Sequence, residues 1–197
     1  MTQYDSVLLA EMTWPEVQEA LDSGVTTAIV AVGSIEQHGP HLPLRMDTMA
    51  GDELSRRIAE RLGNAVAAPT NTVAPDIARE IEANVIALAD LDEYMGLLNE
   101  GLQAADIDYD EPVSHAGATE TSLVLAAEEE LVRTEEYEPG HEGPVSTARL
   151  LSDGFAAVTE NGVLGNPTYA AAQAGEEAFE LVAEEYTEQI DAERDAV

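Results

Sequence analysis

Carboxylate and imidazole side chains gather in one short stretch of this chain, VGSIEQHGPHLPLRMD, which spans residues 32–47. Glu36 and His38 lie two residues apart, so in an extended backbone both side chains point the same way, with Cα atoms about 6.6 Å apart. Such a pair can reach one ion or two neighbouring ions. Imidazole together with carboxylate suits Zn, Mn or Fe, and a carboxylate can bridge two ions. The stretch therefore predicts a divalent-metal site to which Asp47, at the start of the next predicted helix, also contributes.

Each of these residues also has a simpler interpretation. Asp47 is well placed to be an ordinary N-cap of the helix that follows it. Glu36 on its own would be one more surface acid in a very acidic protein. His41 can serve only as a loop residue that orients a neighbour. A Glu-x-His pair by itself is weak support for a metal site, and its combination with two prolines and an Asp after a buried strand is stronger.

The elements that must position this stretch alternate between strand and helix. Residues 26–32, TTAIVAV, are apolar on both faces and predict an interior strand of a parallel sheet. Ligands bind beyond the carboxyl ends of such strands, which is where the stretch lies. The full set of expected elements is helices over 14–21, 47–62, 77–82, 91–102, 120–133 and 168–194, with further strands over 65–68 and 84–89. This order predicts the α/β class, a three-layer α/β/α architecture with a mostly parallel sheet, in a single domain over residues 1–197.

The charge of the chain limits its partners. Eight basic residues, all of them Arg, stand against 40 acidic residues, for a net charge of −32. Such a surface repels nucleic acid and anionic lipid, so we expect neither nucleic acid nor membrane as a partner. The acids are spread through periodic segments that also carry apolar residues, and this does not fit a disordered acidic tail. We interpret the pattern as adaptation to very high salt, in which the Debye length falls to about 3 Å.

Cysteine is absent, so any metal must be bound by His and carboxylate side chains. The N-terminus lacks a basic region followed by an apolar core, and no apolar run approaches the roughly 20 residues of a membrane span. We therefore expect a soluble, cytoplasmic protein.

Three stretches together resemble the creatininase family of metal-dependent amidohydrolases, which open cyclic amides or remove formyl groups. The first is VGSIEQHGPHLPLRMDT in the metal-predicting segment. The second, SHAGATETSLVLA over Ser114–Ala126, is similar to the His-Ala-Gly…Glu-Thr-Ser segment of the family. The third, NGVLGNPTYAAAQAG over Asn161–Gly175, is similar to its C-terminal segment. Their order agrees with the family, and they extend from near the N-terminus to the last predicted helix.

The resemblance implies a role for five residues. Glu36, His38 and Asp47 would be metal ligands, with Asp47 bridging two divalent ions, and Glu120 would lie beside the metals as a further ligand. His115 would be the acid/base that serves the departing nitrogen. The simpler alternatives are that His115 is a core or loop histidine that caps a helix, and that Glu120 is an ordinary first-turn acid.

The chain departs from the family in its middle. Members carry an Asn-Gly-His-Gly-Gly-Asn-like loop after a central strand, and its His completes the metal site. Here the chain passes from Pro75 through DIAREIEA directly to NVIALADLDEY, without such a segment. We therefore expect one central strand–helix unit to be missing, which would leave neighbouring strands without a partner and the metal site short of a ligand. Glu120 or His41 could partly compensate.

Two functions follow. The first is a metal-dependent amidohydrolase that acts on a non-peptide C–N bond, a cyclic amide or formamide, through a metal-bound hydroxide, with one or two Zn or Mn ions (or Fe) per chain. Its partner would be a small-molecule amide substrate. The second is a catalytically impaired or inactive deletion form or paralogue that acts only as an assembly subunit. Family members form closed oligomers, so the resemblance implies a homo-oligomer in both cases.

The charge pattern predicts that folding requires salt near the molar range, because salt screens the self-repulsion of the acidic surface. Circular dichroism recorded as a function of KCl concentration measures this directly. We expect helical signal to be lost in dilute buffer and recovered on addition of KCl. A chain that is equally folded in dilute buffer would contradict the adaptation to high salt.

Overall fold

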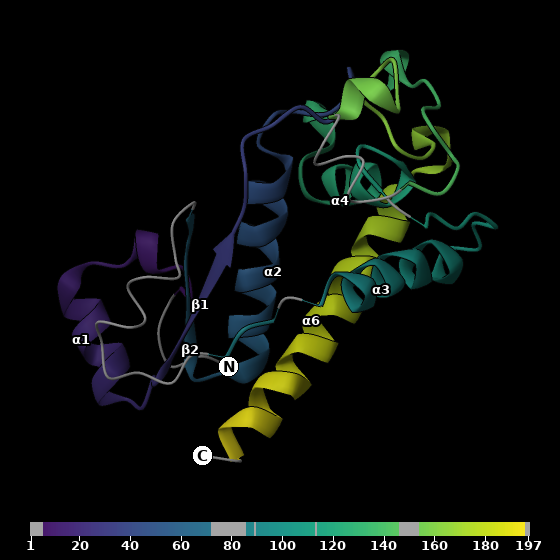
Figure 1. The fold of residues 1–197 in the computed structure, drawn as a ribbon. Coiled ribbons are helices and arrows are strands. Elements are labelled where there is room, and N and C mark those ends of the chain that lie inside the picture. The colour runs from purple at the N-terminus through teal and green to yellow at the C-terminus, as the bar shows by residue number, and fades with distance from the viewer. Residues whose placement is uncertain (1–5, 72–85, 89, 113, 146–153, 196–197) are drawn as a thin grey trace. The chain divides into compact units, whose positions relative to one another are not determined.

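The computed structural model describes residues 6–71, 86–88, 90–112, 114–145 and 154–195 (Figure 1). Two compact units can be separated along the chain, and each is described by itself. Unit 1 comprises Met1–Ser34, Asp47–Ala89 and Ala183–Val197, and unit 2 comprises Ile35–Met46 and Asp90–Val182. The single domain predicted over residues 1–197 stays a prediction.

The helices are α1 (Trp14–Asp22), α2 (Met46–Leu62), α3 (Leu91–Ala104), α4 (Ala118–Glu128) and α6 (Ala172–Asp195), and the strands are β1 (Thr27–Val32) and β2 (Ala65–Asn71). Short 3-10 turns occur at Leu9–Glu11, Glu129–Leu131, Thr134–Glu136, Phe155–Ala157 and Pro167–Tyr169. Among the described residues, none of these helices is long and apolar enough to cross a bilayer.

Unit 1 is built around a parallel pairing of β1 with β2. Ala65 and Ala67 of β2 pack with Ala59 of α2, whereas Val66, which lies between them, packs with Ala20 of α1. Since successive side chains of a strand point to opposite faces, α1 and α2 pack against opposite faces of β2. The predicted α/β class with a parallel sheet is confirmed, and within unit 1 the helices and the sheet form three layers.

The beginning and end of α1 agree with the sequence. The backbone N–H of Thr13 donates to the Glu16 carboxylate at 2.6 Å, which is the reciprocal half of a capping box, and Pro15 lies in the first turn. Gly24, just after the helix, has a φ of 106° that favours glycine.

The predicted interior position of β1 is not found in the described part of the chain. There β1 pairs with β2 alone, and Val30 and Val32 are 48% and 63% exposed. Of the further strand expected over 84–89, residues 86–88 are described and are not in a strand. The helix expected over 77–82 lies outside the described residues. Apolar side chains on both faces of a strand predict that both faces of the sheet are covered, whereas the face of β1 that carries Val30 and Val32 is exposed in the described structure.

Two helices of unit 2 differ from the sequence prediction in where they begin. α4 begins at Ala118, two residues earlier than expected, and gives way to a 3-10 turn at Glu129. α6 begins at Ala172 rather than Thr168, because a 3-10 turn precedes it. In that turn the side chain of Asn166 accepts a hydrogen bond from the backbone N–H of Thr168 at 3.1 Å. Proline and a capping Asn favour such a separate turn over an extension of the helix.

Small residues bring α3, α4 and α6 close together in unit 2. Leu102 of α3, Ala118 of α4 and Ala174 of α6 form one buried cluster. At Gly101 an added Cβ would lie 2.7 Å from the Cβ of Ala178, so a side chain at this position of α3 would force the two helices apart. The close crossing depends on this glycine.

A buried carboxylate secures the N-terminus of α4. Glu111 is 1% exposed, and its carboxylate accepts backbone hydrogen bonds from Ala118 at 2.6 Å, Thr119 at 3.1 Å and Asn166 at 3.1 Å. The Thr119 hydroxyl donates a fourth bond at 2.9 Å. The backbone of Glu111 is itself held by the side-chain amide of Asn99, which bonds both its N–H and its carbonyl. An anion at this position satisfies the N–H groups that a helix start leaves free and complements the helix dipole.

We predict that Glu111→Gln destabilises the protein by about 3 kcal/mol, because the new amide would direct N–H groups at buried N–H donors. Denaturant unfolding in molar KCl measures the change in the free energy of unfolding. Asp110→Asn is the matched control, since this exposed neighbour loses the same charge without losing buried contacts. Equal stability of the two variants would contradict the role given to the Glu111 carboxylate.

Candidate metal and catalytic site

His41 anchors the segment over residues 35–46 to the rest of unit 2. This side chain is fully buried, and its Nε2 lies 2.9 Å from the Thr121 hydroxyl of α4. The carbonyl of His41 accepts a hydrogen bond from the backbone N–H of Arg133 at 3.0 Å. Burial of the ring lowers the pKa of His41 to about 4, so the imidazole is neutral at pH 7. The contacts of His41 therefore hold the segment in place, which fits its interpretation as a loop residue that orients a neighbour.

His115 lies in the turn that leads into α4. Its backbone exchanges two hydrogen bonds with Leu164, at 3.0 and 2.8 Å, which fix the turn against the C-terminal segment. Ala116 follows with a φ of 58°, and Gly117 is the N-cap of the helix. His115 is therefore not the capping residue of α4. The strained turn directs its side chain toward the segment over residues 35–46.

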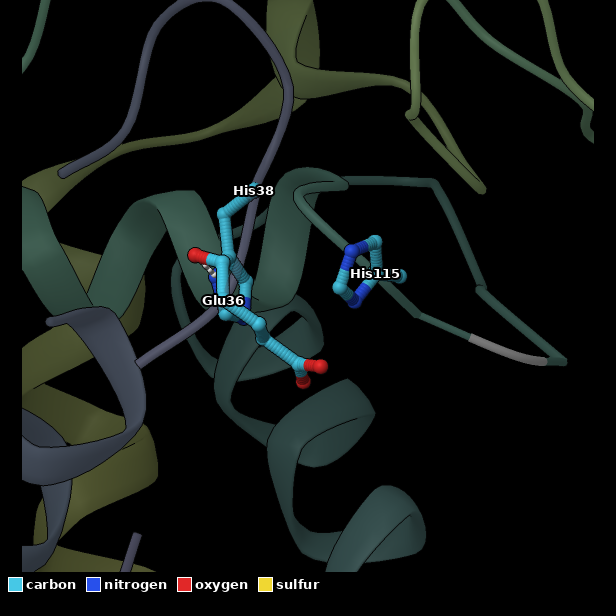
Figure 2. Close-up of side chains that lie close together, drawn as sticks. All are labelled: Glu36, His38 and His115. Atoms are coloured by element: carbon cyan, nitrogen blue, oxygen red, sulfur yellow. Dashed lines mark hydrogen bonds between the residues drawn. The ribbon is translucent and has the colours of Figure 1, made fainter. Parts of the chain in front are cut away.

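Glu36, His38 and His115 come together in unit 2 (Figure 2). Each offers one ligand atom, and these atoms all lie within 4.8 Å of one another. The rings of His38 and His115 stack with centroids 4.5 Å apart, and both residues are buried, whereas Glu36 is exposed. The predicted Glu-x-His pair thus faces the predicted acid/base, although 77 positions separate His38 from His115 in the chain.

Glu120 also lies beside His38. Its carboxylate is 3.9 Å from His38 Nε2 and accepts a hydrogen bond from the backbone N–H of Ala116 at 2.7 Å. The second contact is that of a first-turn helix acid, which was the simpler interpretation of this residue. The structure thus shows the first-turn contact, made by the same oxygen that lies near the imidazole, and the role of Glu120 as a metal ligand stays a prediction.

Asp47 belongs to unit 1, where it lies in the first turn of α2. Its carboxylate accepts a hydrogen bond from the Ser34 hydroxyl. It is the second residue of the helix rather than the residue before it, so the simple N-cap interpretation does not describe it. Its role as a bridging metal ligand stays a prediction.

The donor set of the unit 2 cluster suits a divalent ion. Two ligands of one Zn²⁺ ion, bound at about 2.1 Å each, lie at most about 4.2 Å apart. Donor atoms within 4.8 Å of one another need only small side-chain rotations to reach that spacing. The carboxylate of Glu36 and the imidazole of His38 are ligands that Zn, Mn and Fe accept, and His115 lies close enough either to bind the same ion or to act beside it. Among the described residues, His41 belongs to no cluster of side chains that could hold a metal ion. The structure therefore gives no support to the expectation that His41 replaces the missing ligand.

Gln37 contributes a contact that the sequence did not suggest. Its side-chain Nε2 lies 2.8 Å from His115 Nε2 and 3.3 Å from the carbonyl of Gly162. Gln37 lies between Glu36 and His38 in the motif over residues 32–47. This position is the only feature of the sequence that could have indicated its contact with His115. Glu111 was missed as well, since it stands in the acidic run DIDYDEP and nothing local separates it from its neighbours.

Comparison with known proteins gives a family. The creatininase family model, described as creatinine amidohydrolase, matches residues 10–79 and 71–190. A relative from Mycolicibacterium smegmatis, named mycofactocin precursor peptide peptidase, is 33% identical over 81% of this chain and 82% of its own length. The match of the family model thus divides into two stretches that overlap at residues 71–79, close to where the sequence predicts a missing central unit.

Solved structures agree in fold. The crystal structure of creatinine amidohydrolase (creatininase) has a TM-score of 0.69 and 20% identity, and the match covers 96% of this chain and 98% of that chain. The structure described as creatininase Mn has a TM-score of 0.63 and 19% identity, covering 96% and 99%. These likenesses show a creatininase-like α/β fold, and together with the family model and the peptidase relative they establish that the chain belongs to the creatininase family.

Proposed function

We propose that this chain is a metal-dependent amidohydrolase that cleaves a C–N bond. The observation that carries the proposal is the cluster of Glu36, His38 and His115, in which two motif segments distant in sequence place a carboxylate and two imidazoles within 4.8 Å. A bound divalent ion would supply Lewis-acid chemistry, polarising the carbonyl of the substrate and lowering the pKa of water.

The protein side chains divide into two roles in this proposal. Glu36, His38, Asp47 and Glu120 hold one or two ions of Zn, Mn or Fe, as the family resemblance implies. His115 supplies a proton to the departing nitrogen, because an amide nitrogen leaves poorly as an anion. Its burial and its stacking on His38 hold the ring in one orientation beside the predicted ligands.

The substrate class is the finer part of the proposal. The family resemblance of the sequence motifs favours a non-peptide C–N bond, in a cyclic amide or a formamide. A relative that matches 81% of this chain is named a peptide peptidase, so we extend the proposal to a C–N bond of a peptide. Both substrates present a carbonyl for polarisation and a nitrogen that must be protonated, and the same residues serve either. We also propose that the protein forms a homo-oligomer.

A second function is supported by the division of the family match near residues 71–79. If the central Asn-Gly-His-type loop is missing, one ligand is lost, and the chain would be a catalytically impaired form that acts as an assembly subunit. Restoring a strand–loop–helix unit with that loop between Pro75 and Asn84 discriminates the two. A rise in both bound metal and turnover supports an impaired enzyme, and no change in either contradicts the role given to the missing loop.

We predict that the chain binds at least one Mn²⁺ or Zn²⁺ and that Asp47→Ala removes more bound metal than Glu36→Ala or His38→Ala, because a bridging carboxylate serves two ions. Metal analysis after loading and gel filtration in molar KCl gives the stoichiometry. His141→Ala is the control, since it removes an imidazole outside the predicted ligand set. Metal content in the Asp47 variant equal to that of the parent would show that Asp47 is not a ligand.

We predict that His115→Ala retains the metal content of the parent and lowers kcat for amide hydrolysis by roughly 10²- to 10⁴-fold, the usual contribution of a general acid. The assay compares creatinine, a formamide and a short peptide, and we expect the parent rate itself to be weak because a ligand is missing. His38→Ala should lose both metal and activity. Loss of metal in the His115 variant would instead make this residue a ligand.

A further inference from the structure

Gln37 is exposed, yet both ends of its side-chain amide are engaged. Its Oε1 accepts a hydrogen bond from the backbone N–H of Gly39 at 3.0 Å. Its Nε2 donates to the carbonyl oxygen of Gly162 at 3.3 Å and lies 2.8 Å from Nε2 of His115. Three separate partners therefore determine how this amide is oriented.

The partners exclude the reversed orientation of the amide. Gly39 offers only an N–H to Gln37, and Gly162 offers only a carbonyl oxygen. If the amide were turned over, its NH₂ group would face the N–H of Gly39 and its oxygen would face the carbonyl of Gly162. The group that approaches His115 is therefore the NH₂ group, which is a donor without acceptor capacity. At 2.8 Å, Nε2 of His115 must be the acceptor.

We propose that Gln37 is a positioning residue that holds His115 as the tautomer with its proton on Nδ1. A neutral imidazole carries one N–H and one acceptor nitrogen, so an accepting Nε2 requires the proton at Nδ1. This deepens the proposed function and rests on it: the neutral ring keeps its proton at Nδ1, and Nε2 must take up a second proton, in exchange for the Gln37 hydrogen bond, before the imidazolium can protonate the departing nitrogen.

The same contact determines which histidine of the cluster binds metal. A metal ligand must offer a nitrogen lone pair. In the Gln37-bound tautomer the Nε2 lone pair of His115 is occupied by an N–H, and Nδ1 carries a proton. To become a ligand, His115 would have to give up either the Nδ1 proton or the Gln37 hydrogen bond, although it lies within 4.8 Å of the donor atoms of Glu36 and His38. Gln37 thus separates a ligand histidine from a proton-carrying histidine in one cluster.

Nitrogen-15 NMR of the ring nitrogens tests the proposal on metal-free, substrate-free protein in molar KCl, at a pH well above the ordinary histidine pKa of about 6.5. The chain has four histidines, so His115→Gln assigns the signals by difference. We expect the Nε2 signal of His115 at the position of a nitrogen with a free lone pair and the Nδ1 signal at that of an N–H. The reverse pattern in the parent protein would overturn the proposal.

Gln37→Glu supplies the second arm. The carboxylate can still accept from Gly39 but can only accept from His115, so the Nε2 signal should shift to the position of an N–H nitrogen. Gln18→Glu, the same chemical change on α1, should leave the His115 signals unchanged. An unaltered His115 tautomer in correctly folded Gln37→Glu would show that Gln37 does not determine the tautomer.

If the Gln37→Glu variant fails to fold, Gln37→Leu takes its place. Without the donor, the two tautomers of His115 should mix, and a retained Nδ1–H tautomer would overturn the proposal. Because no arm measures hydrolysis, an inactive enzyme would leave these outcomes interpretable.

Discussion

The buried carboxylate of Glu111 is the interaction on which the geometry of unit 2 depends. It binds the first N–H groups of α4 and, through the N–H of Asn166, the turn before α6. Glycines at 117 and 165 leave room for it, because a Cβ at either position would collide with the carboxylate. α4 carries Glu120, and His115 lies in the turn that enters the helix. The orientation of the candidate site is therefore determined by a charge that takes no part in its chemistry, and a buried charge of this kind is stable only while all its donors are in place.

The features that the sequence predicts well depend on residues close together in the chain. The capping box of Thr13 and Glu16 predicts the start of α1, and the β-branched run before residue 33 predicts β1, because each signal is complete within one turn or one strand. The pairing of Glu36 with His38 follows in the same way from the alternation of an extended backbone. For His115 the prediction depends on the family motif, since nothing in the spacing brings this residue to the pair.

The features that the sequence does not predict depend on contacts between distant segments. Glu111 is one of several acids in its run, and its burial follows from where α4 and Asn166 lie. Gln37 forms its contact with a histidine 78 positions away, and a polar residue between two candidate ligands has no local signal for such a role. The exposed face of β1 is a further case. An apolar strand pattern reports that both faces need partners, but it cannot report whether the chain supplies them.

The family match divides near residues 71–79. This division concerns how many metal ligands the chain can offer, and it does not concern where the cluster of Glu36, His38 and His115 lies. The cluster is formed by the segment over residues 35–46 and by the turn before α4, and both lie outside that division. They are joined directly, by His41 with Thr121 and by Gln37 with His115, and neither contact requires a central strand. Loss of an Asn-Gly-His-type loop would therefore subtract one ligand without releasing the others. Metal binding survives such a loss better than turnover does, since three ligands can hold an ion, whereas a misplacement of about 1 Å can lower the rate a hundredfold. Under the proposed function, affinity for the ion and catalytic rate are therefore separable, because the contacts of His41 and Gln37 hold the segment over residues 35–46 and His115 in place without the missing loop.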